Sequence, residues 1–240
     1  MSRSRSRVLV VGMGGIGGPA ALALARAGVG TIGLCDDDDV ERSNLHRQIL
    51  FADRDAEARV PKVDAAAEAL RAIAPAVELR IHRKRLLPEG AMDLVRQYNV
   101  VLEGADNFAT KFLAADACAL AGIRIVQASA VRWVGTVLAA GPQGRPCYRC
   151  LFEDIPSEGG MGCAEAGVMG PVVGIIAAIQ ADLALAMIDE VPVEGQLVTF
   201  DGRTDELRRR PIAARADCRL CGRRPRIRQI EPRAYVAPSV

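Results

Sequence analysis

The sequence predicts an α/β fold in which a mainly parallel sheet with helices on both faces is followed by antiparallel strands. Three observations support this prediction. Short apolar segments alternate with amphipathic segments from residue 7 to about 129, which is typical of a parallel sheet. A glycine-rich turn follows the first apolar segment. Two Cys-x-x-Cys pairs lie in the second half of the chain, where the alternation has ended.

The elements follow from the spacing of apolar residues. Strands of the alternating part are expected at 7–12, 31–36, 77–82, 99–104 and 123–129. The helices between and after them are expected at 15–28, 60–75, 88–97 and 108–121. Beyond them we expect a longer strand at 131–140, a Gly-rich mobile loop at 151–167 and a hairpin at 196–202 and 204–212.

The composition indicates one globular domain, residues 1–240, with 50% hydrophobic residues. A net charge of +2 gives no broad field for nucleic acid or an anionic membrane. Cys35, Cys118 and Cys163 remain outside the Cys-x-x-Cys pairs, and this odd number fits a reducing cytoplasm better than a secreted disulfide framework. No signal peptide is visible after the basic start.

The segment 166–188 is almost continuously apolar, so its length alone would permit a membrane span. Gln180 and Asp182 interrupt it, and Gly170-Pro171 stands near its start. These residues favour a buried helix with Pro171 in its first turn. Such a helix, apolar nearly all round, either fills the core or packs against a second copy of the chain.

The two Cys-x-x-Cys pairs are Cys147/Cys150 and Cys218/Cys221. Each turn places two thiolates on one side, and two such turns supply the four soft ligands that Zn²⁺ prefers. Both pairs lie in polar sequence rich in Pro, Gly and Arg, which favours zinc over two unrelated core or redox pairs. Four cysteines leave no position for a catalytic water, so we expect the zinc to be structural.

Gly12, Gly14 and Gly17 form a GxGxxG motif between the first strand and the first helix. The first glycine permits a tight turn, the second lets a phosphate approach the backbone, and the helix N-terminus supplies N–H donors. The motif alone is also compatible with a turn that binds nothing. Asp36, at the end of the second strand, is placed to bind a ribose, and by itself it would suggest NAD.

The following residues argue for a triphosphate instead. Asn44, Arg47 and Gln48 fall on one turn of a short helix, and Lys62 opens the next helix. An arginine fork and a lysine charge suit the charge that develops on an α-phosphate and a leaving pyrophosphate. Asp106, after the fourth strand, would lie at the carboxyl edge of the sheet, where we expect it to hold Mg²⁺. Each of these residues alone could be an ordinary surface charge.

Several motifs in order resemble the ThiF, MoeB and HesA adenylyltransferases, the bacterial relatives of ubiquitin-activating enzymes. The similarity runs from about residue 7 to 230 and rests on GMGGIGG, SNLHRQ (43–48), PKV (61–63), ADNF (105–108), PCYRC, CAEAGVMGP (163–171) and CRLCG, with an acidic pair at Asp36 and Asp38. The tail RPRIRQIEP (224–232) is similar to the final strand of that family.

The resemblance implies Mg²⁺-dependent use of ATP to adenylylate the C-terminal glycine of a ubiquitin-like sulfur-carrier protein that ends in Gly-Gly. It implies a homodimer, a nucleotide-binding part at about 7–130, and a carrier-binding and zinc part at about 131–230. Carried over residue by residue, it assigns the ribose to Asp36, the triphosphate to Asn44 and Arg47, phosphate to Lys62 and magnesium to Asp106. The expected nucleotide-binding set is Gly12, Gly14, Gly15, Gly17, Asp36, Asp38, Asn44, Arg47, Gln48, Lys62, Asp106 and Asn107.

Cys163 matches a cysteine that links covalently to the carrier in ThiF-like members and is not needed in MoeB-like members, so both roles stay open. The chain departs from the family pattern at Glu103, usually Asp, and at Lys111, frequently Arg. An N-terminal arginine that reaches the partner's site in the family has no clear counterpart, although Arg3, Arg5 or Arg7 could substitute. No rhodanese-like region follows the last cysteines, so we expect a separate sulfur donor.

The sequence is also compatible with three other functions. The chain could adenylylate another carboxylate or carboxamide, such as a peptide terminus or a modified tRNA nucleoside. It could be an NAD-dependent oxidoreductase, which the glycine motif and Asp36 alone would permit. It could also be an inactive scaffold stapled by zinc, although the joint presence of Arg47, Lys62 and Asp106 argues against that.

Overall fold

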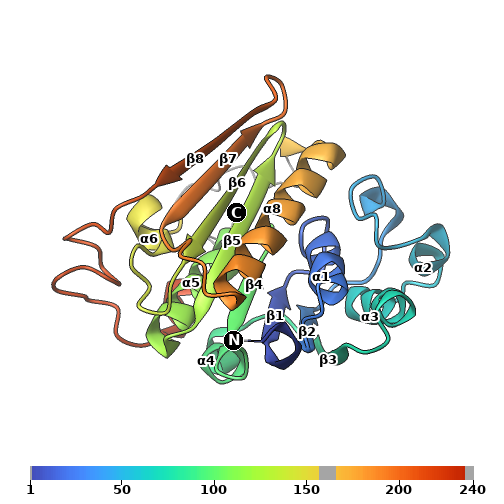
Figure 1. Cartoon of the computed structure of the whole chain (residues 1–240), viewed down its shortest axis with the longest axis horizontal. Helices are drawn as coiled ribbons and strands as arrows, with labels where there is room; N and C mark the ends of the chain where they lie inside the picture. The colour runs from blue at the N-terminus through green and yellow to red at the C-terminus, as the bar shows by residue number, and fades with distance from the viewer. Residues whose placement is uncertain (1, 157–165, 236–240) are drawn as a thin grey trace.

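The computed structural model describes residues 2–156 and 166–235. Its centre is a sheet with strand order β3-β2-β1-β4-β5-β6-β7-β8 (Figure 1). The strands are β1 (Arg7–Val11), β2 (Thr31–Asp36), β3 (Glu78–Arg83), β4 (Val100–Glu103), β5 (Arg124–Val131), β6 (Val134–Ala140), β7 (Gln196–Asp201) and β8 (Glu206–Pro211). The first five are parallel and the last three join antiparallel, as predicted.

Helices cover both faces of this sheet. The described helices are α1 (Gly17–Arg26), α2 (Asp53–Glu57), α3 (Lys62–Ile73), α4 (Pro88–Val95), α5 (Phe108–Ala121), α6 (Tyr148–Leu151) and α8 (Gly170–Ile188), with 3₁₀ turns η1 (Arg3–Arg5), η2 (Arg42–Asn44) and η3 (Pro232–Tyr235). Because side chains alternate along a strand, Val8 and Val10 of β1 enter the core formed with α1, α3 and α8. Leu9 and Val11 enter the core formed with α4 and α5.

Helix α8 has the length and composition of a membrane span, but 61% of its most apolar window is buried inside the protein. It packs against β4, β5 and β6 on one face of the sheet (Figure 1). Pro171 lies in its first turn, as predicted, and Ile176 is fully buried. A Cβ at Gly135 of β6 would collide with the Ile176 side chain, so a glycine lets the helix approach the sheet closely.

The short helices α2 and α6 were not predicted, and two further segments differ from the prediction. Val131 belongs to β5, and the chain turns at Arg132 (φ +54°) and Trp133 before β6 begins at Val134. The break between these two strands was expected at residue 130, and apolar spacing placed it two residues too early because the residues on both sides of the turn are apolar. The expected final strand at 224–232 is wrong: the described backbone there is irregular up to η3.

Candidate functional site

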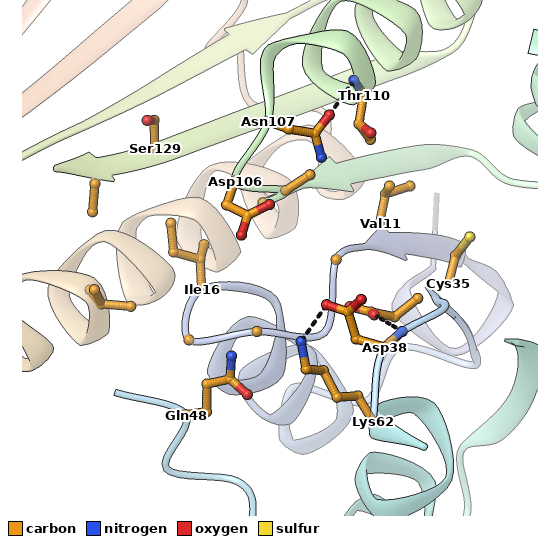
Figure 2. A pocket seen from close by; sticks show the side chains of 18 of the residues that line it. Val11, Ile16, Cys35, Asp38, Gln48, Lys62, Asp106, Asn107, Thr110 and Ser129 are labelled. Carbon is orange, nitrogen blue, oxygen red and sulfur yellow. Dashed lines mark hydrogen bonds and ion pairs between the residues drawn. The ribbon is translucent and has the colours of Figure 1, made fainter. Parts of the chain in front are cut away.

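The sheet has a topological switch between β1 and β4. From β1 the chain proceeds through β2 to β3 on one side, whereas β4 and β5 lie on the other. A crevice opens outside the carboxyl ends of the strands at such a point. Here it is a pocket that receives residues from the ends of β1, β2, β4 and β5 (Figure 2).

The glycine turn forms the floor of this pocket. Gly12 has φ +87°, a conformation that favours glycine, and a Cβ there would lie 3.0 Å from the Ala105 nitrogen. A Cβ on Gly15 would lie 2.8 Å from the Arg47 carbonyl oxygen and 2.8 Å from Val173 Cγ1. Gly12, Gly14 and Gly15 line the pocket. Gly17 does not line it; a Cβ there would collide with the Gly12 oxygen, so Gly17 lets α1 pack against the turn.

Asp36 connects the glycine turn to the end of β2. One carboxylate oxygen accepts a hydrogen bond from the Met13 N–H at 2.6 Å and the other from the Asp38 N–H at 2.9 Å. Burial raises the pKa of Asp36, while these two donors and Lys62 oppose the rise. The carboxylate is therefore fixed in direction and retains lone pairs that could accept from ribose hydroxyls.

Lys62 stands beside this carboxylate at the start of α3. Its side chain is 7% exposed, and Nζ donates to Asp38 Oδ2 at 2.7 Å (Figure 2). Its backbone N–H also donates to the Asp38 carbonyl oxygen at 2.9 Å. Asp38 thus fixes both ends of Lys62 and places a buried cation in the wall of the pocket.

Arg47 and Gln48 enter the pocket from the turn after η2. The Asn44 carbonyl oxygen accepts hydrogen bonds from the backbone N–H groups of both residues. The Asn44 side chain is not part of the pocket lining and donates to Glu41 Oε2 at 3.3 Å, so its phosphate contact stays a prediction. Gln48 is 4% exposed, and its Oε1 has no hydrogen-bond partner among the described residues. An orphan buried acceptor beside a pocket fits a site that receives a ligand donor.

Asp106 and Asn107 line the pocket from the β4 side. Asn107 Oδ1 accepts from the Thr110 N–H at 2.9 Å and caps α5, so its amide nitrogen is the group it can offer a ligand. Asp106 is exposed at the rim, and a carboxylate there suits the oxygen-ligand preference of Mg²⁺.

Four polar lining residues were not predicted: Asp37, Arg85, Thr110 and Ser129. Ser129 lies near the carboxyl end of β5, and its position as the last residue of the strand predicted at 123–129 could have identified it. Arg85 donates to Asp37 at 3.2 Å across two loops, a pairing that no local pattern signals.

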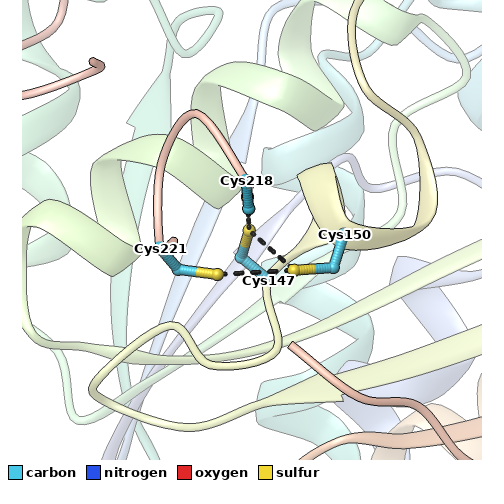
Figure 3. Close-up of side chains that lie close together, drawn as sticks. All are labelled: Cys147, Cys150, Cys218 and Cys221. Carbon is cyan, nitrogen blue, oxygen red and sulfur yellow. Dashed lines mark hydrogen bonds between the residues drawn. The ribbon is translucent and has the colours of Figure 1, made fainter. Parts of the chain in front are cut away.

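The four paired cysteines converge, as their spacing predicted (Figure 3). Their sulfur atoms all lie within 4.8 Å of one another, with Cys147 3.5 Å from Cys218 and Cys150 3.4 Å from Cys221. A tetrahedral ion with Zn–S bonds of about 2.3 Å separates its sulfurs by about 3.8 Å, whereas a disulfide requires about 2.05 Å. The donor set therefore fits a closed zinc site.

Burial opposes the ionisation of two of these thiols. Burial, followed by the charge of the neighbouring thiolates, raises the pKa of Cys147 well above its ordinary range. Burial likewise raises the pKa of Cys221 to about 12. A bound Zn²⁺ would supply the charge that makes four adjacent thiolates favourable. Cys163, the other candidate reactive cysteine, lies outside the described residues.

A buried polar group lies next to this cluster and was not predicted. Arg149, between the first two cysteines, donates from Nη2 to Asp116 Oδ2 at 2.9 Å, and the Tyr235 hydroxyl donates to the same oxygen at 2.7 Å. Arg149 Nη1 also donates to Asp154 at 3.2 Å. These hydrogen bonds join α5, the first cysteine turn and η3, so they hold the first cysteine turn in place.

The fold and this pocket define a nucleotide-binding domain of the adenylyltransferase type. The chain belongs to the ThiF family, whose sequence profile matches residues 2–220.

Known proteins place the chain more closely. The adenylyltransferase and sulfurtransferase MOCS3 of Bos taurus is 44% identical over 232 residues, which cover 93% of this chain and 50% of that protein. MOCS3 of Dictyostelium discoideum is 35% identical over 235 residues, 96% of this chain and 55% of that protein. The chain thus spans about half the length of the curated relatives it matches.

The solved structures agree in fold. E. coli MccB crystallised with ATP superposes with a TM-score of 0.79 at 20% identity, covering 92% of this chain and 68% of that chain. PaaA superposes with a TM-score of 0.73 at 23% identity, covering 88% and 65%. At such identities these likenesses show the shared architecture, which runs through both the parallel and the antiparallel parts of the sheet.

Proposed function

We propose that this protein adenylylates the C-terminal glycine of a ubiquitin-like sulfur-carrier protein, using ATP with Mg²⁺. The observation that supports this most directly is the single pocket that joins the glycine turn, Asp36, Arg47, Lys62 and Asp106. A dinucleotide site needs the first two features, whereas two cations and a rim carboxylate suit a triphosphate with its metal.

In the proposed reaction a carrier carboxylate oxygen attacks the α-phosphorus of ATP. The bond between the α-phosphorus and the bridging oxygen breaks, and pyrophosphate leaves with the electron pair. Arg47 and Lys62 stabilise the charge that develops on the α-phosphate and on the pyrophosphate. Mg²⁺, held by Asp106, would supply further neutralisation of the phosphate oxygens. No general base is required, since the attacking carboxylate is already ionised.

The remaining parts of the proposal concern partners. The carrier is of the ThiS or MoaD type, it docks on the part formed by about residues 131–230, and sulfur arrives from a separate donor. The relatives named MOCS3 carry both adenylyltransferase and sulfurtransferase in their names, which supports a sulfur-related carrier. Zn²⁺ in the four-cysteine cluster has a structural role. The active form is a cytoplasmic homodimer.

The test is ATP–pyrophosphate exchange with Mg²⁺ and a panel of ThiS-like and MoaD-like carriers that end in Gly-Gly. Matched carriers lacking the last glycine are the control. Exchange with the intact carriers alone supports the proposal and identifies the partner. A peptide and a small carboxylic acid are assayed in the same way. Exchange with one of these and with none of the carriers would show that the substrate is another carboxylate.

A further inference from the structure

The two walls of the nucleotide pocket separate at one point of the sheet. β4 and β5 are paired in parallel as far as Glu103 and Gln127. After Glu103 the β4 chain turns away through Gly104 and Ala105 to Asp106, while β5 continues as a strand to Val131. Asp106 therefore belongs to one wall and Ser129 to the other (Figure 2).

A buried ion pair joins these walls. Lys111 of α5 lies within hydrogen-bond distance of both carboxylate oxygens of Glu103, at 3.1 and 3.3 Å, and donates to the Ala128 carbonyl oxygen at 2.7 Å. Glu103 Oε1 accepts from the Ala105 N–H at 2.6 Å. The side chains of Lys111 and Glu103 are 6% and 0% exposed. The pair thus bonds to the backbone next to Asp106 and to the backbone next to Ser129.

The opposite face of the sheet fixes the same point. The Gln180 amide of α8 donates to the Glu103 and Val126 carbonyl oxygens, both at 2.9 Å. On the Lys111 side, Gln127 Nε2 donates to the Lys111 carbonyl oxygen at 3.0 Å. The divergence of the two strands is therefore held from both faces by side-chain hydrogen bonds.

Stability alone does not account for this arrangement. Burial raises the pKa of Glu103, and the Lys111 ammonium opposes that rise, so the pair first has to offset the cost of desolvating two charges. Well-packed hydrophobic residues of similar volume often stabilise a core as well as such a pair does. The ion pair provides something that they cannot, namely directed hydrogen bonds to the Ala105 N–H and the Ala128 carbonyl.

We propose that Glu103 and Lys111 are positioning residues for the pocket: together they fix the Asp106 turn against the Ser129 wall and so set the Mg²⁺-dependent affinity for ATP. This inference rests on the proposed function for the identity of the nucleotide and its metal. Neither side chain touches the ligand; both act through the backbone on either side.

The experiment measures ATP binding by titration calorimetry over a series of Mg²⁺ concentrations, below the unfolding temperature of each variant. Lys111→Met is expected to weaken the Mg²⁺-dependent part of ATP binding by about 10- to 100-fold, the scale of losing one contact to a charged group. The double variant Glu103→Asp with Lys111→Arg keeps both charges, with a shorter acid and a longer base. It is expected to retain most of the wild-type Mg²⁺-dependent affinity for ATP.

Arg149→Met is the matched control. It also removes one partner of an ion pair with side chains 3% and 0% exposed. The described polar contacts of Arg149, however, are with Asp116, Asp154 and the Glu153 carbonyl oxygen, none of which lines the nucleotide pocket or adjoins a residue that does. It is expected to lower the Tm and to leave the Mg²⁺ dependence of ATP binding unchanged. If Lys111→Met does not fold, Glu103→Gln with Lys111→Met, which leaves no unpaired charge, replaces it and is expected to lose the same affinity.

The proposal is overturned if Lys111→Met, or the neutral pair that replaces it, lowers the Tm as Arg149→Met does while its Mg²⁺ dependence matches the wild type. It is also overturned if the double variant Glu103→Asp with Lys111→Arg binds ATP as weakly as Lys111→Met does. The proposed function is tested separately. If none of the carriers supports pyrophosphate exchange by the wild-type protein, carrier activation is refuted, while the ATP-binding titrations still report on the Glu103–Lys111 pair.

Discussion

Asp106 is the residue whose loss separates chemistry from stability most cleanly. It is exposed at the pocket rim, so Asp106→Asn is expected to change the free energy of unfolding by less than about 0.5 kcal/mol. It removes the proposed metal ligand, and pyrophosphate exchange is expected to fall by about 100-fold or more. Asp93→Asn, at an exposed aspartate outside the pocket, is the control and should retain full exchange. If Asp106→Asn is as active as this control, Asp106 is not a metal ligand of the reaction.

Cys147 is expected to behave differently, because its loss opens the four-sulfur cluster. Cys147→Ser should lose bound zinc, measured by elemental analysis, and should lower stability by about 3 kcal/mol or more, which corresponds to roughly 6–12 °C in Tm. Cys118→Ala is matched to it, since Cys118 is also buried but lies outside the cluster. That variant should keep its zinc. A full zinc content in Cys147→Ser would contradict the metal site.

His82 gives a prediction that depends on pH. Its Nε2 lies 2.6 Å from the Tyr98 hydroxyl, and burial, followed by Lys84 and Arg80, lowers its pKa. The unfolded chain therefore binds a proton near pH 6.5 that the folded protein does not bind, so the contribution of His82 to stability is lost as pH falls from about 6.5 towards the native pKa. Urea unfolding at several pH values should show a smaller loss on this interval for His82→Gln than for the wild type. Equal losses of stability in the two proteins would show that protonation of His82 is not coupled to unfolding.

At the scale of the element, the glycine turn and the Arg47 turn depend on each other. Gly15→Ala would place a Cβ 2.8 Å from the Arg47 carbonyl, and neither that backbone nor Val173 of α8 can move cheaply. Gly15→Ala is therefore expected to displace Arg47 and to reduce ATP affinity by about tenfold or more.

The control for this prediction is a glycine at which an added Cβ meets no neighbour. Gly90 lies inside α4, and a Cβ there would meet nothing within 4 Å. Gly90→Ala is expected to leave ATP binding unchanged and to stabilise the protein by about 0.4–1 kcal/mol. Normal ATP affinity in Gly15→Ala would show that the two turns are not coupled.

The sequence predicted helices and strands well where apolar residues recur at a constant spacing along the whole element. α5 begins at Phe108 and ends at Ala121 as expected, because Asn107 caps it and Gly122 (φ +71°) ends it. The turn between β5 and β6 was expected at residue 130 and lies at Arg132 and Trp133, since no glycine or proline marks it and a left-handed arginine leaves no signature in composition.

The site was predicted where a motif fixes backbone geometry, as in the glycine turn and the cysteine pairs. The Glu103–Lys111 and Arg149–Asp116 pairs, separated by 8 and 33 residues, escaped because burial of charge depends on which helix face meets the sheet. The resemblance to the family singled out Glu103 and Lys111 one at a time, but nothing in the sequence indicated that they form a buried pair.

At the scale of the whole molecule, the surface includes apolar residues near the pocket that suit a second copy of the chain. Ile49 is 72% exposed beside Gln48, and Ile175 is 38% exposed on α8. We expect a dimer in solution, measured by sedimentation equilibrium, and Ile175→Glu should shift it towards monomer. Val134→Glu, at an exposed apolar residue of β6, is the matched control for oligomeric state. A monomeric wild-type protein at micromolar concentration would refute the dimer.

The cysteine cluster joins residues 71 positions apart, Cys147 with Cys218 and Cys150 with Cys221. Between them lie α8 and the β7–β8 hairpin. During synthesis the first pair leaves the ribosome long before the second, so the cluster cannot close until this segment has been made. The strand pairings of the parallel half need nothing beyond β5, but α8, which covers one face of that half, lies within the segment that the cluster closes. Zinc supply would therefore act on a late step of maturation, after α8 and the β7–β8 hairpin have been made.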